Sequence, residues 1–283
     1  MSDRTSDNVV VEIVDGVADV RLNRPDKLNA LNTGMFTELV DTSASLATMS
    51  DLRAVVLSGE GRSFCAGLDF SGFQAMAGNK PHQSDRSAVS QSDREFDATA
   101  GTNGRITHLG QQAVWGWREL PVPVICALSG HALGGGFQLS LAGDIRLVHP
   151  DTKMSVLEIR WGLTPDMCAT ELLPRLVGID VAAEMYYTGK MITGREAVDL
   201  GVCTRLSDDP RRDALELASE IATKNPHAVR SAKALVEQFG RVTPAEAFAN
   251  ERRHIGALIG SPNQVEAVSA FFEKRDAKFE NPE

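Results

Sequence analysis

The first apolar positions of the chain alternate with polar turns in a way that predicts a β-hairpin. Val9–Val14 and Val17–Leu22 are short runs rich in β-branched residues. The Asp15-Gly16 pair between them is a strong signal for a tight two-residue turn. From residue 33 to residue 49 the apolar residues instead recur at the spacing of one helix face, which predicts an α-helix.

Three later runs are continuously apolar, which is typical of strands that are buried on both faces. A helix is predicted between the first two of these strands. It follows a long polar stretch that indicates a functional loop or a partly helical segment. The buried strands are expected at 53–57, 122–128 and 144–148, the helix at 106–120 and the polar stretch at 71–104.

Helical periodicity dominates after residue 169. The predicted helices cover 171–177, 181–188, 194–200, 211–224, 228–239, 244–259 and 263–279. A β/α layer followed by helices predicts an α/β fold. We expect a core at residues 1–205 and a helical C-terminal region at residues 206–283.

Composition narrows the classes of partner. The chain has 283 residues, 42% of them hydrophobic, and a net charge of −9. That charge argues against nucleic-acid or anionic-membrane binding but leaves room for an anionic small ligand. There is no apolar run of about 18 residues, and the four cysteines are scattered without metal-ligand spacing. We therefore expect a cytoplasmic protein without a membrane segment or a metal site.

Two junctions rich in small residues follow predicted buried strands. One is Ser63-Phe64-Cys65-Ala66-Gly67-Leu68-Asp69, and the other is Gly130-His131-Ala132-Leu133-Gly134-Gly135-Gly136. Glycine leaves backbone N–H groups accessible, and two such donors on one oxygen form an oxyanion hole. Leu68 and Gly135 are the candidate donors. On local sequence alone, two unrelated tight turns explain the same residues.

With these junctions in place, the chain resembles the crotonase (enoyl-CoA hydratase/isomerase) superfamily. The resemblance rests on five segments, namely 22–32, 64–69, 130–144, 158–176 and 271–275. It implies a spiral of repeated β-β-α units, a helical C-terminal trimerisation region and an acyl-CoA thioester substrate. A homotrimer or homohexamer is expected on the same basis, with no cofactor besides the coenzyme A of the substrate.

The resemblance also implies roles for individual residues. The N–H groups of Leu68 and Gly135 match the donors that hold the thioester oxygen as an enolate forms. The positions expected to bind coenzyme A are Lys27, Leu28, Ala30, Ala66, Asp69 and Gly134.

Carboxylates discriminate among members of this superfamily. Hydratases similar to this chain carry two glutamates, and two carboxylates suit the handling of one water. Here the later one is present as Glu158, but the earlier position holds Gln138, whose neutral amide cannot accept a proton. Asp166 is a further candidate acid, in an arrangement similar to that of dienoyl-CoA isomerases. It could also cap the helix that begins near residue 167.

Isomerisation of a double bond in an unsaturated acyl-CoA is therefore favoured. Glu158 is expected to act as the base and acid, Asp166 as a second proton-transfer group, and Gln138 to position substrate or water. The alternatives are an enoyl-CoA hydratase and a non-catalytic acyl-CoA-binding protein. The region 71–117 is expected to contribute walls of the acyl pocket, and the sequence does not determine the conformation of 71–104 within it.

Overall fold

A computed structural model describes residues 8–69 and 105–282. The predicted hairpin is confirmed: β1 (Val9–Val14) and β2 (Val17–Leu22) are antiparallel. At the turn, Asp15 and Gly16 have φ of 49° and 79°, the left-handed conformation that such a turn needs at both positions. The predicted loop or helix at 71–104 lies outside the described residues.

The main sheet has six strands in the order β1-β2-β3-β4-β6-β9. From β2 onward every neighbouring pair is parallel, through β3 (Ala54–Gly59), β4 (Val124–Leu128), β6 (Ile145–Val148) and β9 (Arg205–Leu206). The three predicted buried strands are confirmed as β3, β4 and β6, each to within two residues at its ends. Because these strands run in one direction, the loops that follow β3 and β4 leave from the same edge of the sheet.

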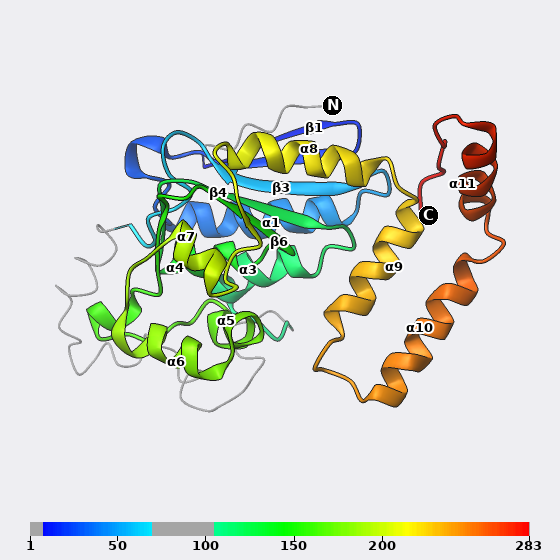
Figure 1. Cartoon of the computed structure of the whole chain (residues 1–283). Helices are drawn as coiled ribbons and strands as arrows, with labels where there is room; N and C mark the ends of the chain where they lie inside the picture. The colour runs from blue at the N-terminus through cyan, green and yellow to red at the C-terminus, as the bar shows by residue number, and fades with distance from the viewer. Residues whose placement is uncertain (1–7, 70–104, 283) are drawn as a thin grey trace.

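Helices cover both faces of this sheet (Figure 1). α1 (Thr33–Ala47) and α3 (Leu109–Arg118) lie on one face, and α8 (Pro210–Ala222) packs against the other. Alternate residues of β3 divide between the two sides: Val55 and Leu57 join the core under α1 and α3, whereas Ala54 and Val56 join the core under α8. This period-two split explains why the strand is apolar throughout.

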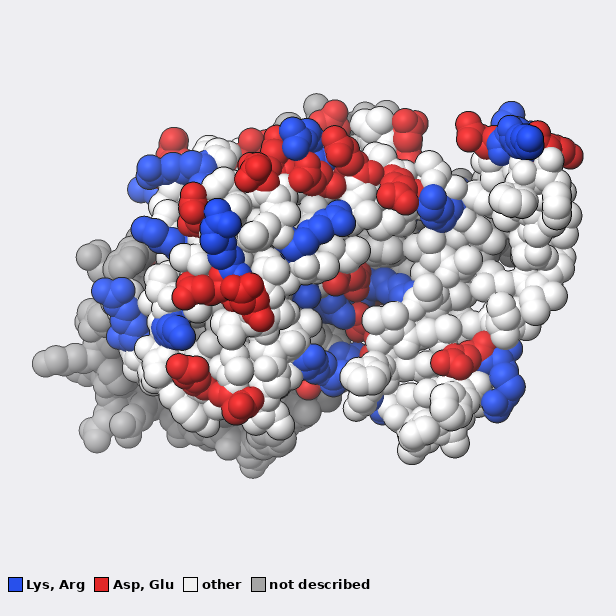
Figure 2. Space-filling view, viewed as in Figure 1, with Lys and Arg blue, Asp and Glu red and all other residues white. Residues whose placement is uncertain are grey.

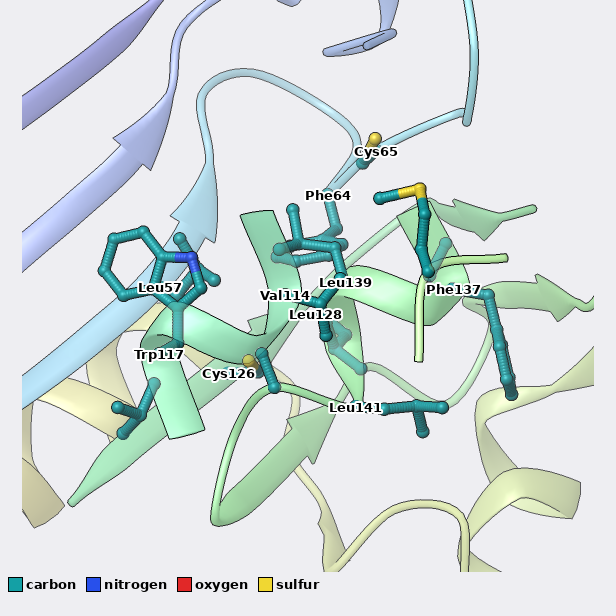
Figure 3. Close-up of a cluster of buried hydrophobic side chains, with 14 of the residues drawn as sticks. Leu57, Phe64, Cys65, Val114, Trp117, Cys126, Leu128, Phe137, Leu139 and Leu141 are labelled. Atoms are coloured by element: carbon teal, nitrogen blue, oxygen red, sulfur yellow. The ribbon is translucent and has the colours of Figure 1, made fainter. Parts of the chain in front are cut away.

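The larger core is centred on α3 and the ends of β3 and β4 (Figure 3). Trp117 of α3 is fully buried there, close to Leu57 and Cys126. Its indole N–H donates to the carbonyl of Ala113 at 2.9 Å, so the buried polar atom is satisfied.

A second, three-stranded sheet was not predicted from the sequence. It consists of β5 (His131–Leu133), β7 (Lys153–Ser155) and β8 (Ile192–Thr193). Strands of two or three residues are too short to show an alternating pattern, so local sequence carries little signal for them. This small sheet holds the glycine-rich segment that follows β4.

α4 (Gly135–Ser140) directly follows the small sheet's first strand. The helices after it follow the predicted order, and they are α5 (Ala169–Val177), α6 (Ile179–Thr188), α7 (Gly194–Asp199), α9 (Pro226–Glu237), α10 (Pro244–Leu258) and α11 (Pro262–Glu273). α10 and α11 lie beyond α9, away from the sheet (Figure 1). The prediction of a last helix to residue 279 is wrong, because Lys274 takes a left-handed φ of 54° and ends α11.

Candidate active site

The two glycine-containing junctions meet in space. The Cys65 N–H donates to the carbonyl of His131 at 2.9 Å, and the Leu133 N–H donates back to the carbonyl of Cys65 at 3.0 Å. Both segments leave the same edge of the main sheet, one after β3 and one after β4. The junctions are therefore two sides of one structure and not unrelated turns.

Three positions at this junction require glycine, each for a physical reason of its own. Gly67 and Gly134 have φ of 92° and 51°, a region that side chains disfavour. Gly136 is helical, but a Cβ there would lie 2.8 Å from the Cβ of Cys65, closer than packed atoms tolerate. Glycine is thus required for the backbones to come this close.

The predicted oxyanion donors border one cavity. Leu68 and Gly135 both line a space of about 580 Å³. Within 8–69 and 105–282, neither backbone N–H donates a hydrogen bond to another backbone group. A Cβ on Gly67 would lie 3.8 Å from the Gly135 nitrogen, so the two donor segments approach closely. This arrangement can receive a negatively charged oxygen.

Glu158 reaches the same cavity from the short 3₁₀ helix η4 (Glu158–Trp161). Its Oε1 accepts a hydrogen bond from Gln138 Nε2 at 2.6 Å. Its Oε2 is buried and has no hydrogen-bond partner among the described residues. Burial raises the pKa of Glu158, the charge of Asp166 raises it further, and hydrogen bonds from its own backbone and from Gln138 oppose the rise.

Gln138 lies behind Glu158 and is fully buried in α4. Its Oε1 accepts from the backbone N–H groups of Met167 at 2.8 Å and Ala169 at 3.3 Å. The side chain is not part of the cavity lining. In the structure its amide contacts the predicted base, Glu158. Its expected role in positioning substrate or water stays a prediction.

Asp166 lines the cavity and is exposed. Asp166 is not the N-cap residue of α5, because that position is held by Cys168. The side chain that bonds the first N–H of the helix, that of Ala169, is Gln138. Of the two interpretations of Asp166, the structure favours a position at the cavity wall.

The residues expected to bind coenzyme A fall into two connected groups. Ala66 and Gly134 line the cavity. The segment that holds Lys27, Leu28 and Ala30 is tied to the first junction, since the Ala66 N–H donates to the carbonyl of Leu28 at 2.9 Å. Asp69 forms an ion pair with Arg24 at 2.8 Å.

Sequence reasoning missed part of the cavity wall. Arg160, Leu163 and Thr164 line it and were assigned no role, although they directly follow Glu158 in the chain. Trp161 also lines the cavity, with 45% of its surface exposed. The available signal was their position in one short segment next to the candidate base.

Two broader expectations concern metals and membranes. Across residues 8–69 and 105–282, His, Cys, Asp and Glu side chains form no cluster of three that could hold a metal ion. Within the same ranges no helix has the length and apolar character needed to span a bilayer.

Comparison with known proteins places this geometry in a family. Residues 12–282 match the family model described as enoyl-CoA hydratase/isomerase. The chain is 30% identical to the short-chain-enoyl-CoA hydratase of Clostridium acetobutylicum over 271 residues, which cover 95% of each protein. It is 29% identical to the crotonyl-CoA hydratase of Syntrophomonas wolfei, over 96% of this chain and 98% of that protein.

Solved structures agree with the sequence comparison. The crystal structure of an enoyl-CoA hydratase from Bacillus anthracis superimposes with a TM-score of 0.81 at 29% identity, covering 96% of this chain and 98% of that one. The crotonase-like fold expected from the sequence is therefore confirmed. The chain belongs to the enoyl-CoA hydratase/isomerase family of the crotonase superfamily.

Proposed function

We propose that this protein isomerises a double bond in an unsaturated acyl-CoA, with Glu158 as the proton carrier. The observation that carries the proposal is the state of the Glu158 carboxylate. Oε1 is bonded to the Gln138 amide, and Oε2 is buried without a hydrogen-bond partner among the described residues. One carboxylate oxygen is thus left for proton transfer, and isomerisation needs only one.

The proposed reaction moves a single proton. Glu158 Oε2 takes a proton from C2 of a 3-enoyl thioester, and the electrons of the broken C–H bond pass to the thioester oxygen. The N–H groups of Leu68 and Gly135 stabilise that charge. Glu158 then returns the proton to C4, which leaves the double bond between C2 and C3. Coenzyme A enters this scheme as part of the substrate.

The raised pKa of Glu158 supports this role. Burial and the charge of Asp166 raise the pKa of Glu158 above that of an ordinary glutamate, in the direction of neutral pH. General acid–base catalysis is most efficient when the pKa lies near the working pH. A pKa near the working pH suits a group that first takes a proton and then returns it, because neither form is then strongly favoured.

Hydration of a 2-enoyl-CoA is the second candidate. It is favoured by the names of the relatives, which are hydratases in C. acetobutylicum and S. wolfei. In that case Asp166, which lines the same cavity, is the carboxylate available to work with Glu158 on a water molecule. A protein that binds acyl-CoA without turnover is the remaining alternative.

Two substrates separate these functions. A 3-enoyl-CoA gains the ultraviolet absorbance of a conjugated thioester when it is isomerised, whereas a 2-enoyl-CoA loses it when it is hydrated. We expect the gain, and we expect Glu158→Gln to reduce it by at least about 1000-fold while coenzyme A binding persists. Rapid loss of the 2-enoyl band with no gain from several 3-enoyl-CoA chain lengths would instead establish a hydratase.

Asp166→Asn is the matched variant, because both acids line the cavity. We expect it to retain most of the isomerase activity. Equal losses in the two variants would support a mechanism with two carboxylates. Activity that survives Glu158→Gln would remove Glu158 from the reaction.

We also propose that the C-terminal helices assemble the protein into a trimer or a pair of trimers. No residue of α10 is buried, and the α11 residues Phe271 and Phe272 are 77% and 78% exposed. Figure 2 shows a largely uncharged surface over the middle of this helical region, with charged side chains gathered at its upper and lower ends on the visible face. Exposed apolar surface of this kind marks an interaction site.

Light scattering on the purified protein tests the assembly. We expect the wild type to have three or six times the mass of the chain, and Phe271→Ser with Phe272→Ser to lower that mass. Ile179→Ser, at an equally exposed apolar position of α6, is the control and should keep the wild-type mass. An unchanged mass in the double variant would place the interface elsewhere.

A further inference from the structure

The start of α5 has an unusual backbone conformation that faces Gln138. Cys168 is left-handed, with φ of 69°. The N–H groups on either side of it, those of Met167 and Ala169, both donate to Gln138 Oε1. Left-handed residues of this kind turn neighbouring N–H groups toward one acceptor and form a small cradle for an oxygen.

This cradle fixes the orientation of the Gln138 amide. If the amide were reversed, its NH₂ group would face two N–H donors and its oxygen would face the carboxylate of Glu158. Both contacts would be repulsive, so only the observed orientation satisfies the amide together with Glu158 Oε1 and the two N–H donors. The amide NH₂ group is therefore directed at Glu158 Oε1, at 2.6 Å.

We propose that Gln138 is a positioning residue that holds one oxygen of Glu158 and keeps its carboxylate ionised, so that the other oxygen exchanges the proton. This inference rests on the proposed function and deepens it. Gln138 acts through Glu158, because its side chain does not line the cavity. It stabilises the anionic form of the base by donating a hydrogen bond to it.

Among residues 8–69 and 105–282, few charged groups lie near Glu158. Asp166 and Arg160 line the cavity with it. α6, which packs against η4, carries Asp180 and Glu184 at exposed positions. Among these groups Asp166 alone contributes to the raised pKa of Glu158, and the Gln138 hydrogen bond opposes that contribution.

A glutamate at position 138 would disfavour the charged form of Glu158, which the Gln138 amide favours. The cradle of N–H groups would hold one of its oxygens, and the other would face Glu158 Oε1 at the place of the amide nitrogen. Two carboxylates at that separation share a proton, because both cannot remain charged. Glu158 would then be protonated over a wider range of pH and would be lost as a base there.

The test compares the pH dependence of kcat/KM in wild type, Gln138→Glu and Gln138→Met. We expect the acid limb to move to higher pH in both variants, by about 1 pH unit or more in Gln138→Glu. Gln112→Met is the matched control, since Gln112 is also buried and also bonds a carboxylate, that of Glu119, at 3.0 Å. The control should leave the acid limb in place.

Titration of the Glu158 carboxyl, followed by infrared difference against Glu158→Gln, gives a readout that does not depend on turnover. Its midpoint should move upward in both Gln138 variants. An unchanged midpoint and an unchanged acid limb, in variants that melt cooperatively, would reduce Gln138 to a packing residue and overturn the inference. A shifted midpoint in a protein without isomerase activity would leave the inference standing while the proposed function failed.

Discussion

Adding one methyl group at Gly136 should disable the site without touching any reacting atom. Gly136 lies in α4 with an ordinary helical backbone, so alanine is not excluded there by φ. A Cβ at this position would lie 2.8 Å from the Cβ of Cys65 and 2.9 Å from its carbonyl carbon. Gly136→Ala is therefore a purely steric perturbation at the point where the two junctions meet.

The size of the effect follows from these distances. Ordinary contact begins near 3.4 Å, so the distance between the two Cβ atoms alone requires the backbones to separate by about 0.6 Å, and the carbonyl oxygen of Cys65, which lies closer still, requires more. That movement strains the 3.0 Å hydrogen bond from the Leu133 N–H to the Cys65 carbonyl. Overpacking and one weakened hydrogen bond together should cost about 2–4 kcal/mol of unfolding free energy. The displaced donors should lower kcat/KM about 100-fold.

Denaturant unfolding and 3-enoyl-CoA isomerisation, measured on the same preparations, check both values. Ser219→Ala at an exposed position of α8 is the control, because it lies outside the helices proposed to form the subunit interface. It should change the free energy of unfolding by about 0.5 kcal/mol or less through helix propensity and leave kcat/KM unchanged. Wild-type activity in a folded Gly136→Ala protein would refute the argument that this close approach sets the donors.

Three further outcomes are expected. Lys233→Met should lower the free energy of unfolding by about 1–3 kcal/mol in denaturant titrations. The buried Lys233 Nζ pairs with Asp144 at 3.0 Å and donates to the carbonyl of Val122 at 2.8 Å, whereas Asp144 keeps Arg118 at 3.4 Å after the change. A smaller loss, within 1 kcal/mol, would mean that the pair contributes little. The kcat/KM of the wild type should fall as the pH drops through the raised pKa of Glu158, at a pH above its ordinary 4.5, since the base is then protonated. Asp166→Asn should move this fall in kcat/KM to lower pH. A fall that stays at the same pH would exclude an effect of the Asp166 charge on the pKa of Glu158. Burial raises the pKa of all four cysteine thiols to about 12, so a disulfide reagent at about pH 8 should react slowly with the native protein and rapidly after unfolding. One fast-reacting thiol in the native state would contradict that burial.

Much of the fold could be predicted from short-range pattern. The hairpin, the buried strands and the order of the helices depend on spacings of two or three to four residues, which the sequence displays directly. Element ends were less accurate, as at α11, because a helix ends where one residue such as Lys274 adopts another φ. The second sheet escaped prediction because its strands are only two or three residues long.

The candidate site divides in the same way. Glu158, Leu68 and Gly135 were predicted from local motifs and from the resemblance that those motifs carry, and the structure brings all three to one cavity. The requirement for glycine at position 136 could not be seen as a distance, because its partner Cys65 is far away in the chain. That spacing exists only once β3 and β4 lie side by side.

By itself the sequence determined most of the elements of the main sheet and its helices, and with them the family. Tertiary structure alone decided what Gln138 does. Its two backbone donors lie 29 and 31 positions further along the chain, and its carboxylate partner Glu158 lies 20 positions away. The physical reason is that a hydrogen bond depends on distance and direction in space. Packing of α4 against the start of α5 sets both, and no local pattern records them.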